Sequence, residues 1–223
     1  MAKSDLPARG HFPKVKLGKK VPKKAEALLI AAFEGDDGLE LPGTALLEGA
    51  ALRSTYEALV AVGATGKTGE VTRVPAPAKA GVASIIAVGL GDAEEVDDET
   101  LRRAAGQAAR SITKVDALAT SLGDFGVAPV VEGLILGGYK YSGLRSESAA
   151  AATTYTVVAG KSAQEEFDNA KITAESVLIA RDLVNTPSNL LYPETYAAFL
   201  SAQGAEAGLE VEVLDEKALE KQG

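Results

Sequence analysis

Short apolar runs alternate with amphipathic stretches along most of the chain. Ala25 to Phe33 and Val82 to Val88 are short apolar runs bounded by lysines or glycines, which predicts two buried strands. Shorter strands are predicted over 71–74, 115–121 and 153–158. Apolar residues that recur at intervals of three and four predict helices over 46–62, from Asp97 or Asp98 to Ile112, and over 127–136.

The last third of the chain predicts one long helix followed by shorter elements. Ser162 to Glu165 matches a capping box, and helical spacing continues to Leu183, before Pro187. The later part of this helix is apolar around most of its circumference, which predicts burial on two sides or a bridge between two bodies. Three elements are predicted downstream: a helix that begins at Pro193, a half-buried strand over 209–214 and a short helix capped by Asp215.

Strands that alternate with crossover helices predict an α/β fold, with a mixed sheet that is partly parallel and flanked by helices. We expect four segments: a flexible basic arm over 1–24, an α/β domain over 25–161, a linker helix over 162–185 and a truncated α/β segment over 186–223. The last segment is too short to cover the apolar sides of the linker helix, so we expect it to be incomplete.

Composition and charge narrow the class of protein. The 223 residues are 46% hydrophobic and 24% charged, as in ordinary globular proteins, and no run approaches the length of a membrane span. The lack of cysteine excludes disulfides and thiolate chemistry but says little about compartment. The start of the chain lacks the apolar core of a secretory signal, so a cytoplasmic location is the default. The arm holds eight Lys and Arg against Asp5, whereas the remainder is acidic. Such an arm can reach a phosphate backbone, but a leader that aids solubility or lies along a neighbouring subunit is favoured, and nucleic acid is not expected as a partner.

Two glycine-rich turns were considered as phosphate sites. Gly89-Leu-Gly91-Asp92 follows a predicted strand, but the third glycine of a dinucleotide turn would fall at Glu94, so the cradle is incomplete. The stretch from Gly63 through Gly66-Lys67-Thr68 has the wrong glycine spacing for a phosphate-binding lysine loop. Both are interpreted as turns.

Catalytic and metal-binding side chains are scarce. His11 is the only histidine, and it lies in the arm where nothing is expected to orient it. One histidine and no cysteine exclude a nitrogen or sulfur metal site. The acidic clusters Asp36-Asp37, Glu94-Glu95 and Asp97-Asp98-Glu99 are in turns or at a helix start, where they favour solvation and the helix dipole. The residues therefore predict no catalytic, metal or cofactor-binding site in this chain.

Several motifs resemble the leucyl aminopeptidase family. Ala180 to Pro187, ARDLVNTP, with Ser188-Asn189 and Pro193-Glu194, is similar to the start of that family's catalytic domain. Upstream, the matching motifs are VGLG at 88–91, LRRAAGQAAR at 101–110, and Glu132-Gly133 with Leu136-Gly137 before Tyr139-Lys140-Tyr141. The resemblance covers about 25–223. Tyr192 departs from the family's usual Thr before the proline, which removes a side-chain cap worth about 1 kcal/mol.

The resemblance implies a macro-domain-like amino-terminal domain and the start of a domain that removes amino-terminal residues, leucine among them, from peptides. Members are typically hexamers with two divalent metals, zinc or manganese, per subunit. The metal ligands, the NTDAEGR motif and the catalytic lysine are expected after Gly223, so this chain alone should be inactive. The alternative is a stand-alone macro-like binding module for a nucleotide-type ligand or nucleic acid.

Overall fold

The computed structural model describes residues 10–43, 46–78, 80–141 and 153–223. They form two compact units. Of the described residues, the larger unit contains those within 11–140 and 153–178, and the smaller contains Gly10, Tyr141 and 179–223.

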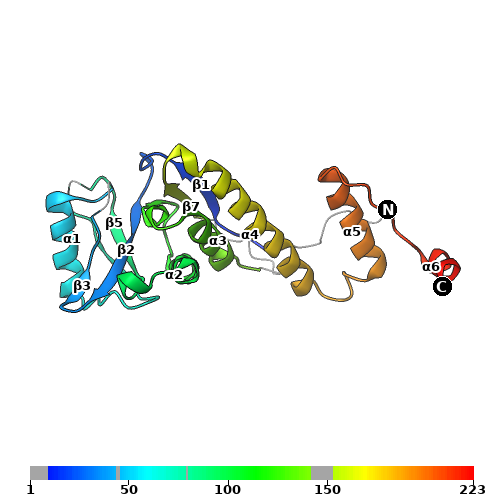
Figure 1. Ribbon diagram of the computed structural model, residues 1–223, viewed down its shortest axis with the longest axis horizontal. Helices are drawn as coiled ribbons and strands as arrows, with labels where there is room; N and C mark the ends of the chain where they lie inside the picture. Colours follow the sequence, from blue (N-terminus) through cyan, green and yellow to red (C-terminus); the bar gives the residue numbers. More distant parts are fainter. Residues whose placement is uncertain (1–9, 44–45, 79, 142–152) are drawn as a thin grey trace. The chain divides into compact units, whose positions relative to one another are not determined.

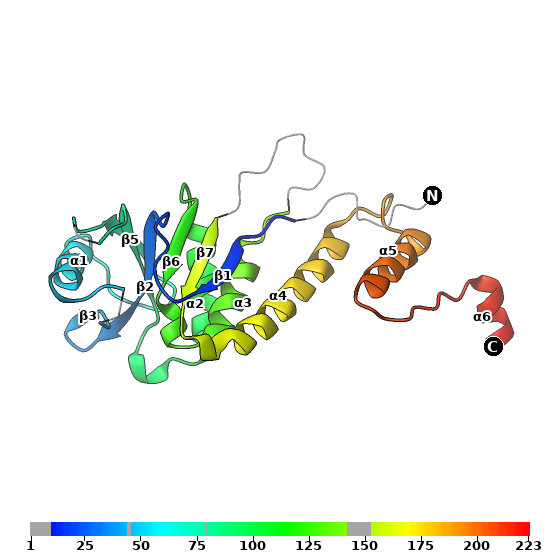
Figure 2. The same ribbon diagram turned by 90° about the horizontal axis from the view of Figure 1, so that it is seen from above.

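The larger unit is built on one mixed sheet (Figures 1 and 2). Its strands are β1 (Lys14–Gly18), β2 (Ala27–Gly35), β3 (Gly38–Glu40), β4 (Val71–Pro75), β5 (Ser84–Gly89), β6 (Ala117–Thr120) and β7 (Thr154–Val158). The order across the sheet is β1-β7-β6-β2-β5-β4, with β3 paired to the end of β2. All neighbours are parallel except β4 with β5 and β3 with β2. The prediction of an α/β fold with a partly parallel sheet is confirmed.

Helices cover both faces of this sheet. On one face, α1 (Gly49–Ala61) packs over Leu28 and Ile30. On the other face, α2 (Asp98–Ser111), α3 (Val127–Gly138) and the first part of α4 (Gln164–Asn185) pack over Leu29 and Ala31. Successive residues of β2 thus face opposite cores, which explains why this central strand reads as one continuous apolar run.

The predicted strands and helices of this unit are present, with shifts of a few residues at their ends. Asp97 caps α2 as predicted, since its carboxylate accepts the Thr100 N–H at 2.7 Å. The prediction of a flexible arm through residue 24 needs correction. Lys14–Gly18 form β1 and pair with β7, because Val15 and Leu17 alternate with lysines and add apolar side chains to the core.

Helices α2 and α3 approach closely through glycines. A β-carbon at Gly137 would lie 2.3 Å from the Gly106 carbonyl oxygen, and one at Gly133 would lie 2.3 Å from the Arg102 carbonyl oxygen. Beside this contact, Arg102 Nε lies 2.6 Å from the Glu132 carboxylate. The Glu132-Gly133 and Leu136-Gly137 motif therefore serves helix packing.

The smaller unit contains the end of α4, α5 (Pro193–Glu206) and α6 (Glu216–Gln222). Pro193 begins α5 and Asp215 caps α6, as predicted. Tyr192 contributes no side-chain cap, but its N–H donates to the Thr195 hydroxyl at 3.0 Å, which supplies half of a capping box. No described helix is long and apolar enough to cross a membrane.

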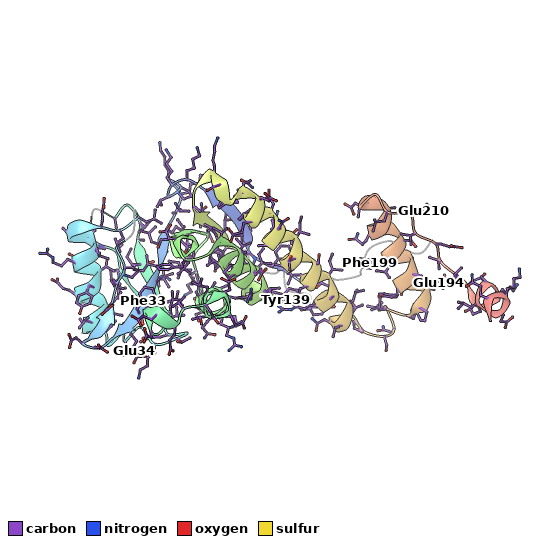
Figure 3. The ribbon with its side chains drawn as sticks, viewed as in Figure 1. Phe33, Glu34, Tyr139, Glu194, Phe199 and Glu210 are labelled. Atoms are coloured by element: carbon purple, nitrogen blue, oxygen red, sulfur yellow. The ribbon has the colours of Figure 1, made fainter. Side chains whose placement is uncertain are left out.

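The strand predicted over 209–214 is absent from the structure. Its alternation is favourable for a strand, but no neighbouring strand is described in this unit to accept its backbone hydrogen bonds. Leu209, Val211 and Val213 are consequently 65%, 42% and 55% exposed. Figure 3 labels Phe199 on α5, which is buried, and Glu210 in the extended segment.

Candidate functional site

The two glycine-rich turns singled out in the sequence lie together at the carboxyl ends of β2 and β5. The Gly91 N–H donates to the Gly66 carbonyl at 3.0 Å, and the Gly69 N–H donates to the Gly89 carbonyl at 2.9 Å. Figure 3 labels Phe33 and Glu34 at the same end of β2. The Glu34 N–H donates to the Gly91 carbonyl at 2.9 Å. In a parallel sheet this edge is the usual place for a ligand, so its geometry decides what the unit can bind.

Glycine is required here because backbone segments touch. A β-carbon at Gly66 would lie 2.1 Å from the Phe33 carbonyl oxygen, and Gly66 also has a φ of +79°. A β-carbon at Gly89 would lie 1.9 Å from the Lys67 carbonyl oxygen. The glycines thus bring the chain against itself at this edge rather than opening a cradle for a phosphate.

Glu70 holds the loop over 63–70 in place. One of its carboxylate oxygens accepts the Thr65 N–H, the Thr65 hydroxyl and the Gly66 N–H, each at 2.9 Å. Burial alone would raise the pKa of Glu70, but these hydrogen bonds, with one from the Lys67 N–H, together lower it below its ordinary value. The carboxylate is therefore ionised at neutral pH and already engages the loop donors that a phosphate would use.

This arrangement is unsuited to an anionic ligand. The Lys67 ammonium, the cation that a phosphate loop would supply, lies 3.9 Å from a Glu34 carboxylate oxygen, with both side chains largely exposed. A phosphate would meet the negative charge of Glu70 and the carbonyls of Gly66 and Gly89. The interpretation of both stretches as turns is supported by this geometry.

The carboxyl end of β6 carries polar side chains that the sequence reading did not single out. Thr120 and Ser121 are buried, and the Thr120 hydroxyl accepts the Leu122 N–H at 3.1 Å. Within the described residues, the Ser121 hydroxyl has no hydrogen-bond partner, and burial raises the pKa of Asp124. The signal in the sequence was the polar pair Thr120-Ser121 directly after an apolar strand. The cavities beside β1 and beside α1 are lined by other residues.

The acidic clusters that the sequence offered as metal ligands have structural roles or do not lie together. Asp36 and Asp37 form the loop between β2 and β3, whose flanking residues Gly35 and Gly38 are paired. The Glu99 carboxylate lies within 2.7 Å of both Arg102 and Arg103. Among the described residues, no group of three His, Cys, Asp or Glu side chains can hold a metal ion. The residues described here thus do not fit a divalent metal.

His11 is oriented through its backbone, not through its side chain. Its N–H donates to the Lys140 carbonyl at 2.8 Å and its carbonyl accepts the Lys140 N–H at 2.7 Å, while the residue is exposed. The expectation that nothing orients His11 is therefore wrong for its backbone, which these two hydrogen bonds hold in place.

The ARDLVNTP motif forms the end of α4. Asp182 is 7% exposed, and its carboxylate accepts the Gly10 N–H at 2.8 Å. The Thr186 hydroxyl donates to the Asp182 carbonyl at 2.7 Å and satisfies an acceptor that the helix end would otherwise leave free. The motif therefore ends a helix and fixes the residue before His11.

Known proteins resemble the chain over its whole length. The sequence profile described as "Cytosol aminopeptidase family, N-terminal domain" matches residues 21–148. A "Probable cytosol aminopeptidase" of Corynebacterium diphtheriae is 48% identical over 227 residues, covering 100% of this chain and 45% of the relative. One of Corynebacterium glutamicum is 46% identical over 98% of this chain, again 45% of the relative.

Solved structures agree with these relatives. Two structures of the bottromycin maturation enzyme BotP, one of them described as in complex with Mn, each superpose with a TM-score of 0.70 at 25% identity. They match over 89% of this chain, and over 41% and 40% of the respective BotP chains. This chain spans less than half the length of the curated relatives named above. Sequence profile, relatives and fold lead to one conclusion: the chain belongs to the cytosol aminopeptidase family and contains that family's N-terminal domain.

Proposed function

We propose that this chain is the amino-terminal part of a metal-dependent aminopeptidase that releases amino-terminal residues, leucine among them, from peptides in the cytoplasm. The 48% identity to the C. diphtheriae relative, which extends over 100% of this chain, is the observation that carries the proposal. The superposition on BotP, which is described in complex with Mn, supports a metal-dependent enzyme.

In this proposal the chain has a structural role. The catalytic residues and the two divalent ions, zinc or manganese, belong to the part of the relatives that this chain does not span. Residues 25–161, together with β1, form the amino-terminal domain, 162–185 the linker helix, and 186–223 the start of the catalytic domain. Since the described residues offer no metal site, no catalytic step is assigned to them.

Exposed apolar side chains of the smaller unit support a partner surface for that further domain. They include Val184 at 85% exposure and Leu209 at 65%, together with Tyr192, Tyr196, Leu200, Val211, Val213 and Leu219. Apolar area of this extent is costly in water and favours burial against another body. A homo-oligomer, a hexamer by family resemblance, would cover part of it as well.

The test is to read the source gene beyond the codon for Gly223 and express the longer product. We expect the frame to continue through lysine and NTDAEGR motifs, and the product to release leucine from a leucyl anilide when Mn²⁺ is added. A longer product that binds Mn²⁺ or Zn²⁺ and folds, yet releases no amino-terminal residue from any peptide of a mixed library, would contradict the proposal.

The alternative function, a binding module for a nucleotide-type ligand, is not favoured. The edge at which such a ligand would bind is closed by the contacts of Gly66 and Gly89, and Glu70 adds a negative charge there. Titration of the chain with ADP-ribose should therefore produce no heat change beyond dilution. A saturable heat change that Glu70→Ala strengthens would revive the alternative.

A further inference from the structure

Strand β1 is an edge of the sheet in the larger unit (Figure 2). It pairs with β7 on one side, and no described strand pairs with it on the other. The Lys14 N–H donates to the Thr153 carbonyl at 3.1 Å, and the Gly18 carbonyl accepts the Ala159 N–H at 3.0 Å. In a parallel pair only alternate residues turn their N–H and C=O toward the partner strand. The N–H and C=O groups of Val15 and Leu17 therefore point to the open side of the strand.

A groove runs beside this open strand. It encloses about 240 Å³, and its lining has apolar and charged members: Phe12, Pro13, Val15 and Ile135, and Lys14, Lys16, Lys171 and Glu175. Lys171 Nζ lies 3.7 Å from a Glu175 carboxylate oxygen, so those two charges largely offset each other. The groove therefore combines apolar side chains with the positive charge of Lys14 and Lys16.

The side chains of β1 give its two faces different chemistry. Val15 is buried and Leu17 packs against the core on the face covered by α3 and α4. Lys14 and Lys16 are exposed and alternate with Val15 and Leu17, so their side chains leave the strand on the opposite face, although both residues also border the groove. Neither is in an ion pair with a described residue. Lys19, Lys20, Lys23 and Lys24 follow, all exposed, so the positive charge continues past the strand.

We propose that β1 binds an extended, acidic segment of a partner protein by strand addition. The segment pairs its backbone with Val15 and Leu17, and its alternate residues are acidic on the Lys14 and Lys16 face and apolar on the Val15 and Leu17 face. Edge lysines disfavour pairing with neutral or basic strands. They favour an acidic strand, because opposite charges directly across a pair of strands are stabilising. Backbone pairing would supply affinity, and the side-chain alternation would supply specificity.

The probe is a fluorescently labelled peptide of six residues that alternates Glu and Val, titrated into the full chain. Because residues 209–214 of the chain have the same alternation, the chain is kept below the concentration at which it self-associates. We expect saturable binding that Lys14→Glu with Lys16→Glu weakens at least tenfold. The matched control, Lys19→Glu with Lys20→Glu, makes the same change of charge outside the strand and should alter affinity by less than threefold.

Two further measurements separate strand addition from attraction between charges. Hydrogen exchange at the Val15 and Leu17 amides should slow on binding, whereas exchange at Lys14, which is already bonded to β7, should not change. A peptide N-methylated at the amides that would pair should bind at least tenfold more weakly, without any change to the protein.

The proposal is overturned if the peptide does not bind, or if N-methylation leaves its affinity unchanged. Unchanged exchange at Val15 and Leu17 would also overturn it. Binding of duplex DNA that exceeds that of the peptide, with the same loss in the Lys14 and Lys16 variant, would assign the lysines to a phosphate backbone instead. None of these results depends on aminopeptidase activity, so they are independent of the proposed function.

Discussion

At the scale of single residues, the glycines and Glu70 show that a sequence motif does not determine which backbone and side-chain contacts its residues make. Gly66-Lys67-Thr68 and Gly89-Leu90-Gly91 each look like part of a phosphate site, and their spacing alone argued against one. The structure supplies the reason: Gly66 faces the Phe33 carbonyl of β2, Gly89 faces the Lys67 carbonyl, and Gly91 faces the Thr68 hydroxyl. The contact of Glu70 with Thr65 and Gly66 joins residues near in sequence, but no periodicity announces it. The glycine spacing predicted turns, whereas the backbone contacts that these glycines make were not predictable from it.

Glu70→Gln should lower the free energy of unfolding by about 1–2 kcal/mol at pH 7, because an amide oxygen is a weaker acceptor for the three donors. The folded-state pKa of Glu70 lies below its ordinary value of 4.5, so the carboxylate stabilises the fold above that pH. This contribution is lost as the pH falls through the folded-state pKa.

Urea unfolding of wild type and variant at pH 7 and at lower pH measures this difference. It should shrink as the pH falls below 4.5. Glu57→Gln is the matched control, since it makes the same change of charge at an exposed position on α1. A difference that stays constant with pH would show that the charge of Glu70 is not responsible.

At the scale of elements, the sequence predicted most of the larger unit because each strand or helix carries its own periodicity. β1 was not predicted, because its segment was assigned to a flexible arm on account of its many lysines. The alternation of Lys14 and Lys16 with Val15 and Leu17 is nevertheless typical of a strand. The strand over 209–214 was predicted wrongly for the opposite reason. Its alternation is clear, but a strand also needs a partner, and none is described for it.

The α2 and α3 contact gives a prediction at this scale. Gly137→Ala should lower the free energy of unfolding by about 1–3 kcal/mol, because its β-carbon would lie 2.3 Å from the Gly106 carbonyl oxygen and would push the helices apart. Helix propensity alone would favour alanine. Thermal and urea unfolding measure whether the substitution lowers or raises the free energy of unfolding. Gly160→Ala is the control, since its β-carbon would lie 3.5 Å from its nearest neighbour. A stabilised Gly137→Ala variant would refute close packing.

At the scale of the whole molecule, the two units differ in how completely they cover their apolar residues. The larger unit has extensive cores on both faces of its sheet. The smaller unit buries Phe199 but exposes Leu209, Val211 and Val213. The sequence anticipated this difference, because too few elements follow the linker helix to cover it.

We therefore expect the chain to self-associate as its concentration rises, through the smaller unit. Val211→Ser with Val213→Ser should reduce the mean mass seen by sedimentation equilibrium, since it removes apolar surface there. Val62→Ser is the control, because Val62 is 61% exposed but belongs to the larger unit. A chain that stays monomeric at all concentrations, or a control that acts equally, would contradict this expectation.

We expect this chain to supply structure and no catalytic group. The pure chain can be incubated with leucine p-nitroanilide and Mn²⁺, and p-nitroaniline release measured with and without EDTA. The rate should equal that of a protein-free control. Release that grows with chain concentration and is abolished by EDTA would contradict it, because catalytic groups would then have to lie within these 223 residues.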